Sequence, residues 1–297
     1  MTKDNFTHKV IESAKISSNE MKAILNSLNC HGFVIIKNFI NNSDLKNLIM
    51  KADESLKENY NAGFSNFSVL KSIKTNWTME FHHPFYISKV ATSIVTNKDF
   101  CNLIKTYLGK PPRIHSALFQ KSFPTNELVL DWHIDLGSNK TLNPKKKYID
   151  KRLRMIVYLT DVNEGGLNYM SGSQKSSVES FIELPYGQLF PKSKIPKDKK
   201  KVHVKGIKGD IILFNTHGLH KPGLLKEERV VLNVWFCRDD FKGKLPPQVL
   251  DVGNLDKENY DLFSTTSNFS GIIDKMEKKS FLRKIKNKFD EFVKSFF

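Results

Sequence analysis

The chain has 297 residues, of which 39% are hydrophobic and 26% charged, and its formal net charge is +16. This composition excludes an intrinsically disordered chain, a collagen-like repeat and a small disulfide scaffold. The first residues carry charges where a secretory signal needs an apolar core. No run approaches the roughly 20 apolar residues of a membrane span, so we expect a cytoplasmic protein. Cys30, Cys101 and Cys237 lie outside any metal or redox spacing and are expected to be free thiols.

The positive charge is concentrated in three segments, residues 145–154, 192–205 and 278–294, which together account for the whole excess of +16. The remainder of the chain is neutral. Two interpretations stay open, because such segments either attract anions locally or are simply solvated lysine loops. Basic and aromatic residues are not interleaved, so the pattern does not favour nucleic acid as a partner.

The start of the chain indicates helix, then strand, then helix. Residues 1–25 are polar and predict a helical lead-in, with a helix start at 17–20. The apolar, β-branched run 32–39 predicts a strand. Asn42, Ser43 and Asp44 are typical of a helix cap, and apolar residues follow at helical spacing.

From about residue 112 to residue 240 the pattern predicts many short strands separated by turns. Such a succession without alternating helices favours a β-sandwich or barrel. We expect turns at 137–139, 163–166, 171–173 and 206, and an insertion loop at 186–201. The expected strands are 114–120, 128–132, 154–159, 202–204, 211–214 and 230–236.

Residues 243–297 are expected to form a linker and then a basic amphipathic helix over 272–297. The apolar residues of this tail fall on one side of a helix and most of its basic residues on the other. Such a helix can lie on an anionic membrane or contact a partner protein. Equally, its apolar stripe can dock on the domain itself.

The most informative local pattern is the segment Asp131-Trp132-His133-Ile134-Asp135. Residues two apart on a strand point to the same face, so His133 and Asp135 can reach one metal ion. Imidazole together with carboxylate suits Fe(II) or another borderline divalent ion.

A tight site needs a third ligand, and the segment 209–223 offers His217 and His220 in a loop after an apolar strand. Two histidines and one carboxylate on one face of a metal leave the opposite face open, which is typical of non-haem Fe(II) oxygenases. Spacing alone does not choose between the two histidines. Arg229 opens the next strand, where it can bind a carboxylate or form a surface ion pair.

In these residues the chain resembles the phytanoyl-CoA dioxygenase family of Fe(II)- and 2-oxoglutarate-dependent oxygenases. Four pieces match in order, at 32–40, 133–135, 158–175 and 209–229, and the match covers roughly 26–240. The resemblance implies a mainly β protein with flanking helices, whose core is a double-stranded β-helix, or jelly roll, over residues 26–242. It also implies that the metal lies at the open end of this core.

The resemblance further implies Fe(II) held by His133, Asp135 and His220, since the family's distal histidine lies ten residues after the Asp of the Gly-Asp strand. Arg229 stands where the family binds the far carboxylate of 2-oxoglutarate. O2 is then the oxidant, with succinate and CO2 as products. Asp135 is the carboxylate that related halogenases lack, which favours hydroxylation. The chain departs from the family pattern at Gln174, where the family usually has His, and at Pro222, where some members have a hydroxyl residue.

The loops 137–153 and 186–201 are expected to rim the open end, and their lysines predict an anionic small or lipid-like substrate. Trp132, together with His82, His83 and Phe85, is a candidate for the pocket wall, although ordinary packing or an exposed loop would also explain these residues. Two alternatives remain open. One is an oxygenase of the same class that acts on a macromolecule, and the other is a non-enzymatic metal-binding jelly roll with a membrane- or partner-binding tail.

Overall fold

The computed structural model describes residues 6–61, 78–82, 84–124, 131–135, 151–175, 195–240 and 260–263. The expected tail helix over 272–297, most of the loops 137–153 and 186–201, and most of the expected strand 128–132 lie outside these residues. No helix in the described ranges is long and apolar enough to cross a membrane.

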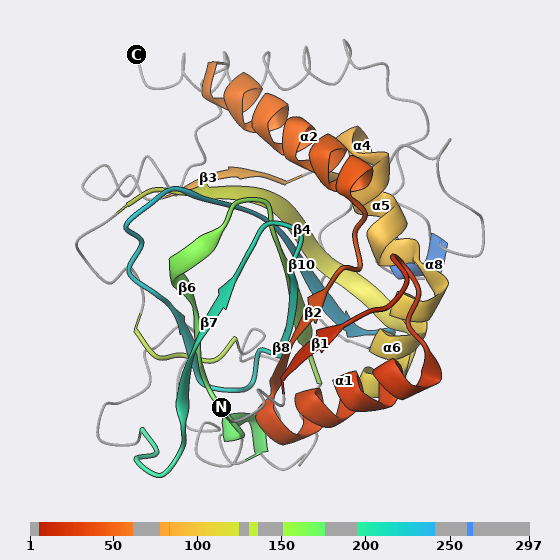
Figure 1. Cartoon of the computed structure of the whole chain (residues 1–297), viewed down its shortest axis with the longest axis vertical. Helices are drawn as coiled ribbons and strands as arrows, with labels where there is room; N and C mark the ends of the chain where they lie inside the picture. The colour runs from red at the N-terminus through yellow and green to blue at the C-terminus, as the bar shows by residue number, and fades with distance from the viewer. Residues whose placement is uncertain are drawn as a thin grey trace.

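Two sheets form the body of the molecule (Figure 1). The large sheet has the order β1-β2-β8-β5-β10-β4-β3 and the small sheet the order β7-β6-β9. Apart from the parallel pair β1 and β2, the paired strands run antiparallel. The strands of the large sheet are β1 (Thr7–Lys9), β2 (Phe33–Lys37), β3 (Thr78–Phe81), β4 (Pro112–Ser122), β5 (Leu153–Tyr158), β8 (Ile211–Asn215) and β10 (Arg229–Arg238). Those of the small sheet are β6 (Val162–Met170), β7 (Lys201–Gly206) and β9 (His220–Pro222).

Both faces of the large sheet are apolar, because one face packs against the helices and the other against the small sheet. Along β10, Val230, Leu232 and Val234 join the cluster that the helices cover. Val231, which points the other way, joins a second cluster with Tyr158 of β5 and residues of the small sheet. The space between the two sheets is therefore a packed interior, and the predicted jelly-roll fold is confirmed.

Helices cover the outer face of the large sheet (Figure 1). They are α1 (Ser18–His31), α2 (Asn42–Asn61), α4 (Pro84–Ile87), α5 (Lys89–Thr96), α6 (Lys98–Leu108) and the short α8 (Tyr260–Phe263). Ser17 caps α1 with a capping box closed by Glu20, as the sequence predicts. The cap of α2 is Asn41, one residue before the expected position, because its side-chain oxygen accepts the backbone N–H of Asp44 at 2.9 Å.

Three elements differ from the sequence expectations. The segment 1–25 is not a separate helical lead-in, since β1 pairs with β2 and α1 runs on to His31. The expected turn at 163–166 lies inside β6, where the pairing register with β7 shifts between Val162 and Leu167. Its glycines mark an irregularity in the strand pairing, which a sequence pattern cannot tell from a turn. The pair α5 and α6 was not anticipated from the sequence.

Candidate metal centre

A short extended segment carries the first two candidate ligands. The backbones of His133 and His220 exchange two hydrogen bonds of 3.0 Å, which form an isolated bridge beside β9. The N–H of Asp135 then donates to the carbonyl of Thr216 at 2.9 Å. These three bonds fasten 131–135 to the start of β9 and to the loop before it, so residues 87 and 81 positions apart along the chain lie side by side.

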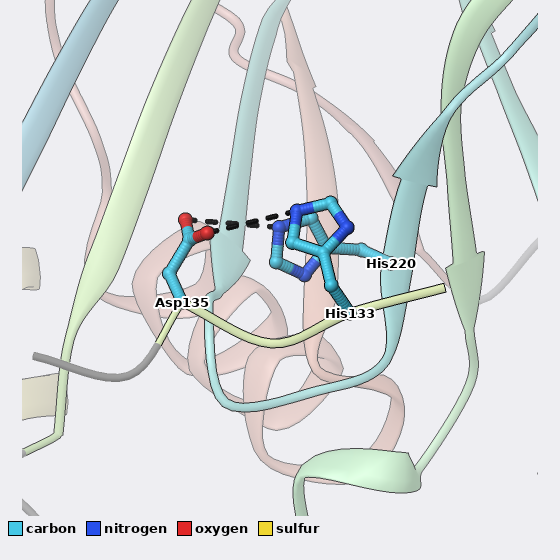
Figure 2. Close-up of side chains that lie close together, drawn as sticks. All are labelled: His133, Asp135 and His220. Atoms are coloured by element: carbon cyan, nitrogen blue, oxygen red, sulfur yellow. Dashed lines mark ion pairs between the residues drawn. The ribbon is translucent and has the colours of Figure 1, made fainter. Parts of the chain in front are cut away.

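The side chains of His133, Asp135 and His220 converge (Figure 2), and their candidate ligand atoms all lie within 4.8 Å of one another. His133 Nε2 lies 3.6 Å from Asp135 Oδ1, and His220 Nε2 lies 3.7 Å from Asp135 Oδ2. His217 is buried and its backbone N–H donates to the Asn215 side chain, but it is not a member of this group. The structure thus selects His220 from the two histidines that spacing left open.

Both imidazoles present the same nitrogen to the centre. His133 Nδ1 donates to the carbonyl of Asp131 at 2.8 Å, and His220 Nδ1 donates to the carbonyl of Gly218 at 2.9 Å. A carbonyl only accepts, so each Nδ1 carries a hydrogen and each Nε2 is the nitrogen left to face the centre. His220 Nε2 and Asp135 Oδ2 are buried without a hydrogen-bond partner in the described part of the chain. These are the atoms that a divalent ion would satisfy, so the three residues fit one.

The ionisation states of Asp135 and His133 also suit the binding of a metal ion. Burial opposes ionisation of Asp135, but His220, Arg154 and His133 outweigh it and hold the pKa of the carboxyl below its ordinary value. Burial and the neighbouring His220 lower the pKa of His133 to about 4. At neutral pH the site therefore offers a carboxylate and an unprotonated imidazole, the forms in which these groups bind metal.

Further contacts hold the segment in place. Lys221 Nζ pairs with Asp131 Oδ1 at 3.1 Å and lies 5.3 Å from the centre of the Trp132 ring. The His220 ring stacks near Tyr169, with 6.4 Å between the ring centroids. Tyr169 in turn donates its hydroxyl to the carbonyl of Asn215 at 2.8 Å. The ligand-bearing backbone is therefore tied to both sheets.

Arg229 lies at the start of β10, on the same face as Val231, and so it faces the interior between the sheets. Its Nη1 donates to the carbonyl of Gly165 at 2.6 Å and its Nη2 to Ser122 Oγ at 3.4 Å, while Nε is buried without a partner. Within the described ranges no carboxylate forms an ion pair with it. A buried guanidinium that has no carboxylate partner in the described ranges fits the carboxylate of an acidic cosubstrate.

The residues predicted for the pocket wall lie in different parts of the chain's structure. Trp132 is buried and packs in a small cluster with Met170 and Leu219. Phe85 belongs to the main core, with its ring 5.3 Å from that of Phe263, so packing beneath the helices accounts for it and the pocket-wall assignment is not supported. His82 forms an ion pair with Glu80 at 3.4 Å. His83 lies outside the described residues.

Arg154, which lies beside the metal group, was not predicted as a site residue from the sequence. Its guanidinium stacks on the Trp235 ring at 4.0 Å, donates to Asn233 Oδ1 at 3.2 Å and lies 3.9 Å from Asp135 Oδ2. Arg154 alternates along β5 with Ile156 and Tyr158, which face the interior. A cation on the inward face of a predicted strand was the signal that could have identified it.

A cavity of about 310 Å³ opens beside Asp135 at this end of the large sheet. Its walls come from the starts of β4 and β5, the end of β10 and the loop after β8. The residues that line it are His115, Ser116, Asp135, Arg152, Arg154, Thr216, Trp235 and Phe236.

Comparison with family models gives a match to phytanoyl-CoA dioxygenase (PhyH) over residues 28–223, about two thirds of the chain. The chain belongs to this family. No curated protein sequence matches it.

Solved structures share the fold at low identity. EctD from S. alaskensis, with 2-oxoglutarate and 5-hydroxyectoine, has a TM-score of 0.57 at 14% identity, and the match covers 91% of each chain. The non-haem α-ketoglutarate-dependent carbocyclase SnoK from nogalamycin biosynthesis has a TM-score of 0.55 at 15% identity, over 77% of this chain and 87% of its own. The epimerase SnoN with Fe³⁺, α-ketoglutarate and nogalamycin RO has a TM-score of 0.52 at 13% identity, over 75% and 85%.

At these identities the structural likeness establishes the fold alone. Family membership and the His133, Asp135 and His220 group together identify the chain as an Fe(II)- and 2-oxoglutarate-dependent dioxygenase. The predicted requirement for iron and 2-oxoglutarate is thereby confirmed for this class of enzyme.

Proposed function

We propose that this dioxygenase hydroxylates a small, anionic organic substrate. In the overall reaction one oxygen atom of O2 enters a C–H bond of the substrate, and the other enters succinate as 2-oxoglutarate loses CO2. The observation that carries the proposal is the three-residue metal group, of which Asp135 also lines a cavity of small-molecule size. The lysine-rich loops predicted to rim the site favour an anion.

In this proposal His133, Asp135 and His220 would hold Fe(II), with each histidine using the Nε2 that its backbone hydrogen bond leaves free. When bound, the iron and 2-oxoglutarate supply the activation of O2. The chain's own residues bind and orient the reactants. Arg154 neutralises and positions Asp135, and the wall of Trp235 and Phe236 excludes water from the reacting C–H bond.

Arg229 would bind the far carboxylate of 2-oxoglutarate. Its two terminal nitrogens are held by Gly165 and Ser122, so the guanidinium plane has a fixed direction before any ligand arrives. The buried Nε and the missing carboxylate partner in the described ranges support this role. A rigid, preoriented guanidinium favours a planar dianion over a neutral molecule.

The decisive experiment supplies the protein with Fe(II), ascorbate, 2-oxoglutarate and a metabolite extract without oxygen, and then admits isotopically labelled O2. We expect succinate to form and one small anionic metabolite to gain a labelled oxygen atom. His133→Ala and Asp135→Ala should each lose at least about a hundredfold in succinate formation, since loss of an outer-shell partner alone costs up to that amount. Both variants should retain the wild-type unfolding temperature, because neither side chain belongs to a main apolar cluster.

Equal turnover in Asp135→Ala and in the wild type would remove Asp135 from the metal centre. Succinate that forms only with added nucleic acid or protein would favour a macromolecular substrate, and its complete absence would favour a non-enzymatic metal-binding protein. A contact of residues 272–297 with a membrane or partner, and a cytoplasmic location, stay predictions.

A further inference from the structure

A network of side-chain hydrogen bonds crosses the inward face of the large sheet and ends beside the proposed metal centre. Arg154 of β5 donates from Nε and Nη2 to Asn233 Oδ1 of β10, at 3.3 and 3.2 Å. Asn233 Nδ2 donates to Gln120 Oε1 of β4 at 2.9 Å, and Gln120 Nε2 donates to Glu80 Oε1 of β3 at 3.0 Å. Four neighbouring strands, β5, β10, β4 and β3, therefore share one polar network.

The strand register explains why these side chains meet. Trp235 lies opposite Arg154, and Asn233, two residues away on β10, points to the same face. Gln120 lies opposite Glu80 in the pairing of β4 with β3. Asn233 is buried, so the network closes its polar groups off from water.

The direction of each hydrogen bond in the network is fixed by its two ends. A guanidinium only donates, so Asn233 must turn its oxygen towards Arg154. The hydrogen bond from His82 lowers the pKa of Glu80, whose ionised carboxylate only accepts, so Gln120 must turn its nitrogen towards it. The remaining amide groups then face each other as donor and acceptor. Neither amide can flip without losing hydrogen bonds on both of its sides.

At the other end of the network, the Arg154 guanidinium stays at a distance from the metal group. Its Nη1 lies 3.9 Å from Asp135 Oδ2, whereas a charge-assisted hydrogen bond has a length of about 2.8 Å. The guanidinium is restrained by Asn233 and by the Trp235 ring, whose centre lies 4.0 Å from it. Asp135 Oδ2 is left buried without a hydrogen-bond partner in the described part of the chain.

This distance matters because a guanidinium and a metal ion compete for the same carboxylate. Arginine and carboxylate commonly form a bidentate pair, which would occupy the oxygens that the ion needs. A shift of the guanidinium by about 1 Å would be enough to form a hydrogen bond to Asp135. Held at its present distance, Arg154 still lends its charge to the carboxylate without using the lone pairs of Oδ2.

We infer that Asn233 is a positioning residue of the metal centre, which holds the Arg154 guanidinium away from Asp135 so that the carboxylate stays open to the ion. Gln120 and Glu80 support this role, because they fix the orientation of the Asn233 amide. The inference rests on the metal-ligand role proposed above for Asp135, and it is independent of the substrate.

The test measures metal affinity without turnover. Zinc is titrated into the metal-free protein against a competing chelator, without 2-oxoglutarate or oxygen. Asn233→Leu removes the acceptor for Arg154 at nearly constant side-chain volume, so the released guanidinium should pair with Asp135. We expect this variant to bind zinc about tenfold to a hundredfold more weakly, the usual effect of losing a residue that supports a metal ligand.

The decisive comparison repeats the substitution in a protein without the guanidinium. In an Arg154→Met background, Asn233→Leu should change the zinc affinity by less than about twofold, because no cation remains that could move onto Asp135. A residue that merely supported the fold would lower the affinity alike in both backgrounds, and that result would overturn the inference. So would a zinc affinity of Asn233→Leu equal to that of the wild type.

Asn163→Leu is the matched control, because it makes the same substitution at an exposed position of β6 outside the network. It should leave the zinc affinity unchanged, and a loss equal to that of Asn233→Leu would contradict the positioning role. If Asn233→Leu does not fold, Gln120→Met, at a half-buried position, breaks the next hydrogen bond of the network. It should weaken zinc binding only while Arg154 is present, and an affinity equal to that of the wild type would then overturn the inference.

The proposed metal centre and the role of Asn233 fail in distinguishable ways. If Asp135→Ala binds zinc as tightly as the wild type, the proposed centre is wrong and the role of Asn233 is lost with it. If Asp135→Ala loses zinc while Asn233→Leu retains it, only the role of Asn233 is removed.

Discussion

The two histidines of the metal group act through one tautomer because each Nδ1 is occupied by a nearby backbone carbonyl. In both cases the carbonyl lies two residues earlier in the chain, on Asp131 and on Gly218. The same local geometry thus orients two rings from different parts of the sequence. At this scale the proposed chemistry depends on a few hydrogen bonds rather than on the large apolar core.

Arg229→Ala should raise the 2-oxoglutarate concentration needed for half-maximal succinate formation by about tenfold to a hundredfold, the worth of hydrogen bonds to a charged group. Maximal turnover should change less, because the lost interaction binds the cosubstrate before and during reaction alike. Steady-state kinetics with varied 2-oxoglutarate would measure both values. Arg229→Lys, which keeps the charge, should lie between, and an unchanged requirement in Arg229→Ala would remove this residue from the cosubstrate site.

At the scale of single elements, the capping box of α1 connects a local sequence signal to the stability of the fold. Ser17 Oγ accepts the N–H of Glu20 at 3.3 Å, and the Glu20 carboxylate accepts the N–H of Ser17 at 2.7 Å. Helix α1 leads directly into β2, so its start sets where the chain enters the large sheet.

Ser17→Ala should lower the free energy of unfolding by about 1 kcal/mol, the usual cost of losing such a cap. Urea denaturation would measure the change. Ser18→Ala is the matched control, because Ser18 is the first residue of the helix proper and makes no side-chain contact in the capping box. A loss of stability in the Ser18 variant equal to that in the Ser17 variant would contradict a capping role.

The irregular pairing within β6 also has a steric reason in the sequence. A Cβ on Gly166 would overlap the carbonyl oxygen of Val204 on the neighbouring strand β7. Gly166→Ala should therefore push the strands apart and destabilise the fold by about 1–3 kcal/mol, as overpacking does. Chemical denaturation would detect it. Gly109→Asn, at a left-handed position that strains any side chain but has open space around it, should cost less than Gly166→Ala, and an equal loss there would contradict the steric argument.

Across the whole molecule, buried histidines couple stability to pH. Burial is the main cause that lowers the pKa of His115 to about 4 and of His217 to about 3, from an ordinary value of 6.5. The unfolded chain therefore takes up protons on these groups below pH 6.5, while the folded protein does so only nearer their lowered values. The free energy of unfolding should fall as pH drops from 6.5 towards 4, because protons bind preferentially to the unfolded state.

Each of these histidines contributes up to about 1.4 kcal/mol per pH unit in that range. Urea midpoints of the metal-free protein at neutral pH and near pH 5 would show the fall. His115→Gln should flatten it, since one titrating group is removed. Identical midpoints at both pH values would show that the rings are not held neutral in the folded protein.

Features that depend on near neighbours in the chain could be predicted from local sequence patterns. The strands around β2, β5, β8 and β10, the capping box of α1 and the family follow from periodicity, local capping chemistry and ordered motifs. The pair His133 and Asp135 was also local, because residues two apart on an extended chain share a face. The turn expected at 163–166 was wrong, since glycines at an irregularity of strand pairing and glycines in a turn look alike along the chain.

The folded structure was needed for the features that depend on contacts between distant segments. It placed His220 rather than His217 beside Asp135, because a backbone bridge joins the segment 131–135 to β9. In the folded structure Phe85 lies in the core, and Arg152 and Arg154 line the same cavity. Such positions follow from the packing of two sheets against each other, and no periodicity within a single segment contains that information.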